Sequence, residues 1–250
     1  MHNLNYHKEK IKNTFNRASH CYDDHASIQQ QIGFHLQELV QPYHRPNSTI
    51  IDLGCGTGIT TQQLANRMIF RELHAIDIAE SSLAIAKQRM PQSNIKIYFS
   101  DFDHLPADTS HFDLIFSNMA LHWSDHIHST IVTLTKRLTL SGMLAFSIPI
   151  NGTFHELLSH NFYSCRTFIH ATSIKKTCAQ NGLFCKSWSK KTVLQFKSTH
   201  HTLRSIKNTG ATYVNKKNHK GLVGKSFLMH KKIHSLTYNI GYFLIRTSPL

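Results

Sequence analysis

Residues 50–58 have the sequence Ile50-Ile51-Asp52-Leu53-Gly54-Cys55-Gly56-Thr57-Gly58, an apolar run that leads into a glycine turn. A helical pattern begins near Thr60, directly after that turn. Glycines permit a tight turn and let a ligand touch bare backbone amides, so the turn indicates a nucleotide-like cofactor. Dinucleotide-binding turns place glycines at the first, third and sixth positions. Here the sixth position is Ile59 and the third glycine comes one residue early, which argues against NAD.

Short apolar runs alternate with helical patterns on both sides of this turn. We expect strands at residues 49–53, 73–78, 95–99, 112–116 and 143–148, and helices at residues 60–71, 81–90 and 124–138. This alternation predicts a parallel sheet covered by helices on both faces. Ligands of such sheets bind at the carboxyl ends of the strands, where the strand order reverses. Two later strands, at residues 193–196 and 238–245, are expected to complete the sheet.

The chain divides into three parts by pattern and composition. Residues 1–46 repeat apolar side chains at three- or four-residue spacing and are predicted to form a helical preface and lid. Residues 47–150 carry the strands and are predicted to form the cofactor-binding core. Residues 151–250 are richer in Lys, Ser, Thr and His. We expect this last part to add lid helices, one of them starting near Thr202 ahead of Gly210, and the last strands.

Composition limits the expected cellular location of the protein and the class of its binding partners. The 250 residues include 28 Lys and Arg, 14 Asp and Glu, and 20 His, for a net charge of +14. Nucleic acid, an anionic membrane surface or an acidic protein would each suit that charge. No apolar run is long enough to cross a bilayer and none near the start resembles a signal peptide, so we expect a cytoplasmic protein. The five cysteines form no CxxC pair and are expected to stay reduced.

Asp77 and Ile78 lie at the end of the second expected strand, 25 residues after Asp52. A carboxylate at this place can accept hydrogen bonds from both hydroxyls of a ribose, and it would repel a ribose phosphate. The structural alternative is that Asp77 caps the helix expected from Ser81.

The glycine spacing resembles the first motif of the class I S-adenosylmethionine-dependent methyltransferases. The resemblance implies an α/β, Rossmann-like fold: a mostly parallel seven-stranded sheet with helices on both faces and a helical lid. It also implies that the loop around Asp52, Gly54, Gly56 and Gly58 wraps the amino acid end of S-adenosylmethionine, which leaves as S-adenosylhomocysteine.

Ser100-Asp101-Phe102 follows the third expected strand. In the methyltransferases an Asp at this place accepts a hydrogen bond from the adenine amino group, and Phe102 would flank the adenine ring. The alternative is that Asp101 is a turn residue in the Asp-rich stretch that runs to Asp108.

The fourth expected strand runs into Asn118, and His122 and Trp123 follow it closely. At the crevice this segment must lie beside the methionine moiety, with Asn118 as the polar contact, whereas His122 and Trp123 suit helix capping and packing better than catalysis. His122 and His126 have the spacing of two metal ligands on a helix. Chance explains that spacing in a chain with 20 His, and no metal is expected.

Three further segments narrow the family. They are Phe15-Asn16-Arg17-Ala18-Ser19-His20-Cys21-Tyr22-Asp23-Asp24-His25-Ala26, Ser117-Asn118-Met119-Ala120-Leu121-His122-Trp123 and Leu203-Arg204-Ser205-Ile206-Lys207-Asn208-Thr209-Gly210-Ala211-Thr212. Together with the ending Leu236-Thr237-Tyr238-Asn239-Ile240 they resemble the malonyl-[acyl-carrier protein] O-methyltransferases of biotin synthesis. The first and third segments are the specific ones, since most methyltransferases lack both. Residues 151–190 match poorly, and Ser100 replaces a glycine common in the family.

The resemblance implies that the free carboxylate of a malonyl thioester on acyl-carrier protein, or on coenzyme A, receives the methyl group. Tyr22 is the candidate residue beside that methyl group; alternatively, it is a core residue of the N-terminal helices. Arg204 is the candidate that binds the carboxylate, with Arg17 as its substitute; alternatively, Arg204 is a solvated surface charge. Acyl-carrier proteins are acidic, which agrees with the basic charge of this chain. The carrier is expected to contact some of the lysines at positions 190, 191, 207, 216, 217, 220 and 225.

Two other functions compete with this one. The chain could methylate another small acid or a ring with the same cofactor. Alternatively, it could be a nucleic-acid-binding module that keeps the fold as a scaffold, although its basic residues are not interleaved with the exposed aromatic residues that single-strand binders use. We therefore expect no nucleic-acid partner.

Overall fold

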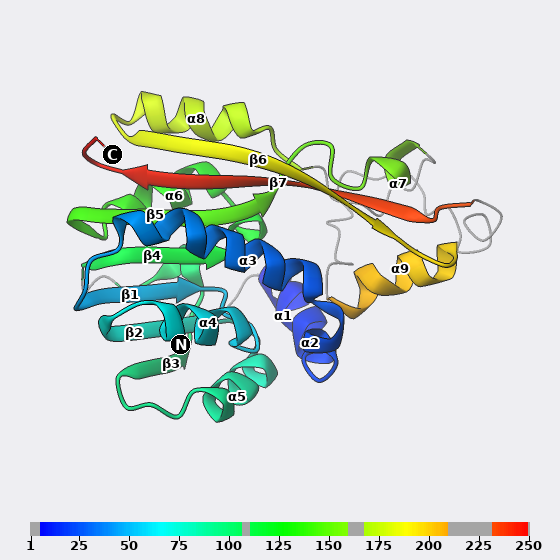
Figure 1. Cartoon of the computed structure of the whole chain (residues 1–250), viewed down its shortest axis with the longest axis horizontal. Helices are drawn as coiled ribbons and strands as arrows, with labels where there is room; N and C mark the ends of the chain where they lie inside the picture. Colours follow the sequence, from blue (N-terminus) through cyan, green and yellow to red (C-terminus); the bar gives the residue numbers. More distant parts are fainter. Residues whose placement is uncertain (1–5, 107–110, 160–167, 210–231, 250) are drawn as a thin grey trace.

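The computed structural model describes residues 6–106, 111–159, 168–209 and 232–249. Its centre is one seven-stranded sheet in the order β3-β2-β1-β4-β5-β7-β6 (Figure 1). The strands are β1 (Ser48–Leu53), β2 (Phe70–Asp77), β3 (Ile95–Phe99), β4 (Phe112–Asn118), β5 (Leu138–Pro149), β6 (Phe184–Gln195) and β7 (Ser235–Arg246). The first five are parallel, and β7 pairs antiparallel with both β5 and β6. The expected α/β fold is confirmed.

Helices cover both faces of the sheet (Figure 1). They are α1 (Tyr6–Ala18), α2 (Tyr22–His25), α3 (Ser27–Val40), α4 (Ile59–Arg67), α5 (Glu80–Arg89), α6 (Ile127–Thr135), α7 (His155–Ser159), α8 (Ala171–Gln180) and α9 (Thr199–Asn208), with short 3-10 turns η1 (Gln41–Tyr43), η2 (Phe102–His104) and η3 (Leu121–Trp123). Apolar side chains of α3, α4 and α5 pack in one buried cluster and those of α1, α6 and α8 in another. The three-four spacing of residues 28, 32 and 36 explains why α3 buries one stripe.

Several elements have other bounds than the sequence pattern predicts. Helix α4 ends at Arg67 instead of residue 71, because Met68 takes an extended backbone and β2 begins at Phe70. Helix α6 begins only at Ile127, because residues 121–123 form a 3-10 turn. His122 and His126 therefore share no helix face, and no cluster of metal-binding side chains occurs in the described part of the chain.

Strand β6 is three times as long as the expected strand at residues 193–196. It is one of the two edge strands, and all of its residues are exposed or half-buried, so it has no buried apolar run that sequence patterns could detect. Its full-length antiparallel pairing with β7 holds it in place. Lys186, Lys190 and Lys191 are exposed along it.

The strand order reverses between β1 and β4, so the carboxyl ends of these two strands form the crevice where ligands of such sheets bind. These ends point toward α1 and α2 (Figure 1). Among the described residues, no helix combines the length and apolarity needed to span a membrane. Lys216, Lys217, Lys220, Lys225 and Cys165 lie outside the described residues.

Candidate active site

The glycine turn joins β1 to α4, and its three glycines have left-handed backbones with φ of 73°, 55° and 80°. A side chain at Gly54 would lie 2.3 Å from the Cβ of Ala120, and one at Gly58 would meet Met90 and Ala86. At Gly56 an added Cβ would meet nothing within 4 Å. Two glycines therefore allow close packing, and the third leaves open space in front of the loop.

The backbone amides of these glycines are not bare, contrary to the sequence-based expectation. Gly54 donates to the Ile76 carbonyl at 2.8 Å, Gly56 to the carboxylate of Asp77 at 2.8 Å, and Gly58 to the Cys55 carbonyl at 3.0 Å. These bonds fix the turn against the end of β2. The loop therefore contributes its shape, and Asp77 is joined to it directly.

Asp77 ends β2 and is anchored by two backbone amides. One carboxylate oxygen accepts from Gly56, and the other accepts from Ala79 at 2.7 Å. Ala79, not Asp77, is the residue that precedes α5, so the capping alternative is not what the structure shows. Burial raises the pKa of the Asp77 carboxyl, and the backbone amides of Ala79, Gly56 and Ile78 oppose that shift. A carboxylate has about four lone-pair sites, so Asp77 can still accept from a ligand hydroxyl.

Asp101 and Phe102 follow β3 and lie under α1. Asp101 is buried, caps the turn η2, and accepts from the Asp103 amide at 3.0 Å. Lys8 of α1 is only 1% exposed; its ammonium lies 3.1 Å from an oxygen of Asp101 and 2.7 Å from one of Asp103. It also lies 4.5 Å from the centre of the Phe102 ring. One buried cation is thus shared by two carboxylates and offsets one of their two negative charges.

Asn118 ends β4 with both ends of its amide engaged. Its amide nitrogen donates to the Gln29 carbonyl of α3 at 2.9 Å, and its oxygen accepts from the Ser147 hydroxyl at 2.7 Å. The next residue, Met119, has a φ of 55°, which is costly for a residue with a side chain. Such conformations cluster at functional sites, where the surrounding structure holds them.

Tyr22 begins α2, and the next residue ties that helix to the glycine turn. The carboxylate of Asp23 accepts from the Thr57 hydroxyl and from the Arg89 guanidinium, both at 2.5 Å. Arg89 also donates to the Thr57 carbonyl, which closes a ring of three residues from α2, the turn and α5. Burial, reinforced by Asp77 and Asp23, raises the pKa of the Tyr22 phenol, so the phenol stays protonated at neutral pH.

Asp52 lies inside the end of β1, where it is 2% exposed. Its carboxylate accepts from the Thr61 hydroxyl at 2.6 Å. Burial raises the pKa of Asp52 to about 7; the hydrogen bond from Thr61 opposes this shift and the charge of Asp77 adds to it. The acid is therefore poised to lose its proton when a cation binds nearby.

These elements enclose two adjoining cavities that meet at Tyr22. One is about 70 Å³, and its lining includes the predicted residues Gly54, Gly56, Asp77, Ile78, Phe102 and Asn118, with Ile11, Phe15 and Trp123 as apolar walls. The other is about 40 Å³ and is lined by Asp52, Gly54, Gly56 and Asn118 among others. Both are smaller than the roughly 300 Å³ of small ligand sites, so a nucleoside can enter only when the covering side chains move outward.

Four predicted residues do not line these cavities. Gly58 packs against α5, and Asp101 lies behind Phe102 with its charge paired to Lys8. Arg17, on α1, and Arg204, on α9, are exposed. A larger cavity of about 290 Å³ opens at the amino ends of β1 and β4, far from the glycine turn.

Sequence reasoning missed the residues that act across elements. Lys8 pairs with residues more than 90 positions away, and a lysine on an amphipathic helix gives no signal of burial. Thr57 and Arg89 also gave none. Asp23 could have been found, because it follows Tyr22 in the distinctive segment at residues 15–26.

Comparisons with known proteins agree with this geometry. A family model described as "Methyltransferase domain" matches residues 50–142. The chain is 34% identical over 242 residues to malonyl-[acyl-carrier protein] O-methyltransferase 2 of Coxiella burnetii, covering 96% of both chains. It is 29% identical to the biotin biosynthesis bifunctional protein BioHC of Cellvibrio japonicus, covering 88% of this chain and 44% of that one.

Among solved structures, the fold is similar to that of the "DhpI-SAM-HEP complex", with a TM-score of 0.58 and 13% identity over 98% of this chain and 99% of the other. The site residues fit S-adenosylmethionine as a ligand. Gly56 leaves space for it, and the anchored carboxylate of Asp77 faces the same cavity.

We predict that Gly56→Ala weakens the binding of S-adenosylhomocysteine by about 1 to 3 kcal/mol, or roughly 5- to 150-fold in Kd, because the methyl group occupies ligand space. Gly182→Ala is the matched control, since Gly182 has a φ of 66° and also has no atom within 4 Å of an added Cβ. Both variants should lose about 1 to 2 kcal/mol of stability from the left-handed backbone. Calorimetric titration measures the Kd, and an equal Kd for the two variants would contradict the prediction.

We predict that the affinity for S-adenosylmethionine rises as the pH increases from about 6 to about 8. With a pKa of about 7, the Asp52 carboxyl is mostly protonated at the lower pH, and a cationic ligand binds its ionised form more tightly. Binding at low pH must therefore release a proton. Calorimetry in buffers of different ionisation enthalpy counts that proton. Asp52→Asn should flatten the pH dependence, whereas Asp24→Asn, at an exposed acid of α2, should leave it intact.

Proposed function

Because this chain belongs to the malonyl-[acyl-carrier protein] O-methyltransferases, we propose that it methylates the free carboxylate of a malonyl thioester on acyl-carrier protein, as a step of biotin synthesis. The chain is an S-adenosylmethionine-dependent methyltransferase. The observation that carries the substrate proposal is the 34% identity to a protein of that name over 96% of both chains.

The reaction requires no proton transfer to or from a protein side chain. A malonyl carboxylate is already ionised at neutral pH, so no general base has to act. When bound, the cofactor supplies a methyl group on a positively charged sulfur. The protein then has to align the carboxylate oxygen with that methyl group, at about 3 to 3.5 Å, and to hold it there.

We propose that Tyr22 aligns the carboxylate. Its side chain lines both cavities, and its raised pKa keeps the phenol a hydrogen-bond donor. The ring of Asp23, Thr57 and Arg89 holds α2, and with it Tyr22, against the glycine turn. Tyr22 therefore presents a protonated oxygen at the edge of the cofactor space.

The lining supports no guanidinium clamp. Within the described part of the chain, neither cavity is lined by Lys or Arg, and both Arg17 and Arg204 are exposed. The positive charge of the cofactor itself suits the substrate carboxylate as its counter-charge. Apolar walls from Ile11, Phe15 and Trp123 exclude water, which favours a reaction in which two opposite charges disappear.

We propose that the cofactor contacts follow the family pattern: Asp77 with Ile78 at the ribose, Asp101 and Phe102 at the adenine, and Asp52 and Asn118 toward the methionine end, with the loop of Gly54, Gly56 and Gly58 as the frame. We also propose that acyl-carrier protein is preferred over coenzyme A, that nucleic acid is not a partner, and that the protein works in the cytoplasm.

The proposed function is tested by incubating the protein with isotopically labelled S-adenosylmethionine and, in turn, malonyl-acyl-carrier protein, succinyl-acyl-carrier protein and malonyl-coenzyme A. Mass spectrometry of the acyl group should find one added methyl on the malonyl thioester, and the base-labile product should be its ester. Turnover of the succinyl thioester alone, or of neither, would refute the malonyl assignment.

Tyr22→Phe should lower kcat/KM for the malonyl thioester about tenfold, the effect of losing one hydrogen bond to a charged group. Because the substrate carboxylate loses its charge on the way to the transition state, most of the effect should appear in KM. The Kd for S-adenosylhomocysteine should not change, and steady-state kinetics with calorimetry measures both. A normal KM in this variant would show that the phenol does not hold the substrate.

A further inference from the structure

The charges of this chain are sharply segregated along the sequence. All fourteen Asp and Glu lie within residues 1–156, where they outnumber twelve Lys and Arg. Residues 157–250 contain sixteen Lys and Arg and no acidic residue. The whole positive excess of the protein therefore belongs to its last part, and an acidic partner is attracted there and not to the N-terminal part.

Within the described part of that region, α9 presents a face of basic and imidazole side chains. His200, His201, Arg204 and Lys207 are exposed, and their spacing places them along one side of the helix. The opposite side is buried: the Thr202 hydroxyl donates to the Ile233 carbonyl at 2.7 Å, and Ile206 is 7% exposed. We name these four exposed residues the α9 basic face.

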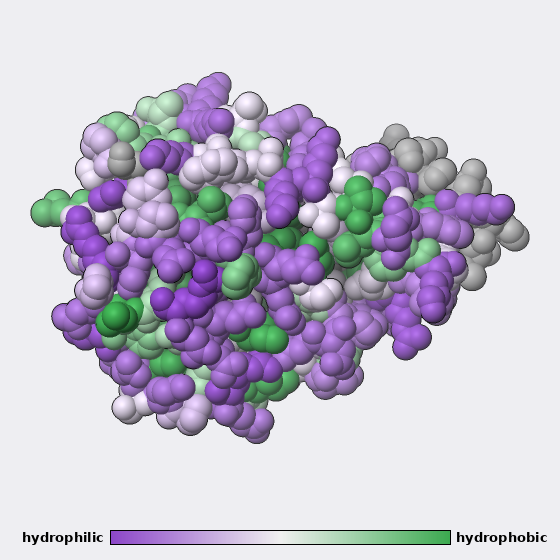
Figure 2. Space-filling view, in the orientation of Figure 1, coloured by the Kyte–Doolittle hydropathy of each residue, from purple (hydrophilic) through white to green (hydrophobic). Residues whose placement is uncertain are grey.

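The α9 basic face lies next to the helix that carries Tyr22. Helix α9 contacts α2, the helix that begins with Tyr22. Figure 1 shows α9 beside α1 and α2, and α8 at the opposite end of the molecule. Figure 2 shows mostly hydrophilic residues on the side where α9 lies. A carrier bound here would hold a thioester on a flexible arm close to the cavities.

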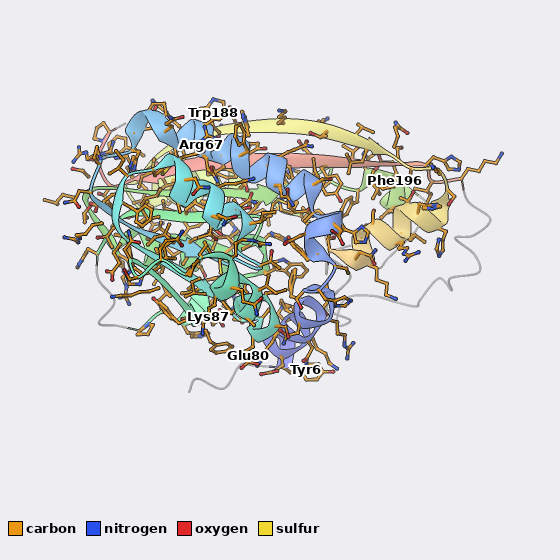
Figure 3. The ribbon with its side chains drawn as sticks, turned by 60° about the horizontal axis from the view of Figure 1, so that its bottom comes forward. Tyr6, Arg67, Glu80, Lys87, Trp188 and Phe196 are labelled. Carbon is orange, nitrogen blue, oxygen red and sulfur yellow. The ribbon has the colours of Figure 1, made fainter. Side chains whose placement is uncertain are left out.

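A second basic region lies on α8, which precedes β6 in the chain, whereas α9 follows β6. Trp188 lies within β6 and Phe196 just beyond its end, well separated from each other (Figure 3), and α9 begins three residues after Phe196. Lys175 and Lys176 of α8 are also exposed, but α8 packs on β6 at the end away from α9 (Figure 1). The two regions carry charge of the same sign, but of the two helices α9 is the one that contacts α2 beside the cavities.

We propose that the α9 basic face docks acyl-carrier protein, and that Arg204 serves this contact from outside the pocket. The proposal rests on the proposed function, which supplies the acidic partner. Charge complementarity at such a rim mainly raises the association rate and makes binding sensitive to salt. It also explains how Arg204 can belong to a distinctive segment of the chain and yet be exposed.

The test measures the binding of acyl-carrier protein bearing its prosthetic arm to the full-length enzyme, by fluorescence anisotropy at low and high salt. Lys207→Glu should raise the Kd about fivefold or more at low ionic strength, with a smaller effect at high salt. Lys175→Glu, the same charge reversal on α8, should bind like the parent. An unchanged Kd for S-adenosylhomocysteine shows that each variant is folded. Equal carrier binding by both variants would overturn the proposal.

Kinetics then separate docking from catalysis. Lys207→Glu should raise KM for malonyl-acyl-carrier protein and leave turnover of malonyl-coenzyme A unchanged. Arg204→Glu should behave in the same way, whereas an equal loss with both carriers would make Arg204 a substrate clamp and remove it from the docking face. A parent enzyme that binds the carrier but methylates no malonyl thioester would refute the proposed function while the binding comparison still decides on the docking face.

Discussion

Lys8→Met should destabilise the protein by about 3 to 5 kcal/mol, because it leaves two buried carboxylates, Asp101 and Asp103, without their cation. Methionine keeps most of the side-chain length over the Phe102 ring, so the loss reports mainly the missing charge. Burial alone would raise the pKa of Asp103, but Lys8 and the hydrogen bonds around it hold that pKa below its ordinary value. The free energy of unfolding from denaturant titrations measures the effect.

Lys12→Met is the matched control for this variant. Lys12 is on the same helix, lies over the Phe99 ring and pairs with Glu80 at 3.2 Å, but the Glu80 side chain is 64% exposed, so its carboxylate stays hydrated without the lysine. Its loss should cost at most about 1 kcal/mol. Adding Asp103→Asn to Lys8→Met should restore part of the stability, because one unpaired buried charge is then removed. Equal losses for Lys8→Met and Lys12→Met would show that burial gives the Lys8 pair no special weight.

Asp77→Ala should weaken cofactor binding by about 1.5 to 3 kcal/mol, the range for hydrogen bonds to a charged group, or roughly 10- to 150-fold in Kd. The carboxylate is held by the amides of Gly56 and Ala79 and lines the cavity, so it is already in place to accept from the ribose. Calorimetry with S-adenosylhomocysteine measures the change. An unchanged affinity would refute the ribose role.

Two comparisons make the Asp77 result specific. Glu80→Ala removes the same charge a few residues later, at the exposed start of α5 (Figure 3), and should leave the Kd unchanged. The 2′-deoxy analogue of S-adenosylhomocysteine should bind more weakly than the parent ligand to the unaltered protein. The Asp77→Ala variant should bind the two ligands with equal affinity, because it lacks the carboxylate that would accept a hydrogen bond from the 2′-hydroxyl.

Local pattern predicts the central elements of this fold well. The five-residue apolar run at residues 49–53 placed β1 within one residue of its bounds, because a central strand is buried on both faces. The run at residues 95–99 also placed β3, although β3 is an edge strand in which only Ile95 is buried. Strand β6 escaped, since an exposed outer strand is held by pairing and not by its own apolar residues. The end of α4 was misplaced because the extended backbone at Met68 depends on the start of β2.

Some residues of the candidate site could be predicted from local sequence and others could not. Residues at strand ends, such as Asp77 and Asn118, follow from the register of a parallel sheet, which brings the carboxyl ends of its strands together. The ion pairs of Lys8 with Asp101 and of Arg89 with Asp23 join segments more than 60 residues apart, and nothing in the local sequence encodes them. The exposed position of Arg204 was equally hidden, because an arginine on an amphipathic helix suits a pocket or a surface.

The outer strand β6 also bears on how the protein avoids self-association. It is twelve residues long, and among the described residues one row of its backbone donors and acceptors has no neighbouring strand. Such a row is a template for pairing with another copy. Trp188 and Val193 are exposed along it and would favour that pairing. Lys190 and Lys191 point to opposite faces of the sheet, so a second copy laid edge to edge would meet like charges on both sides. These lysines therefore disfavour the pairing of β6 with the β6 of a second copy.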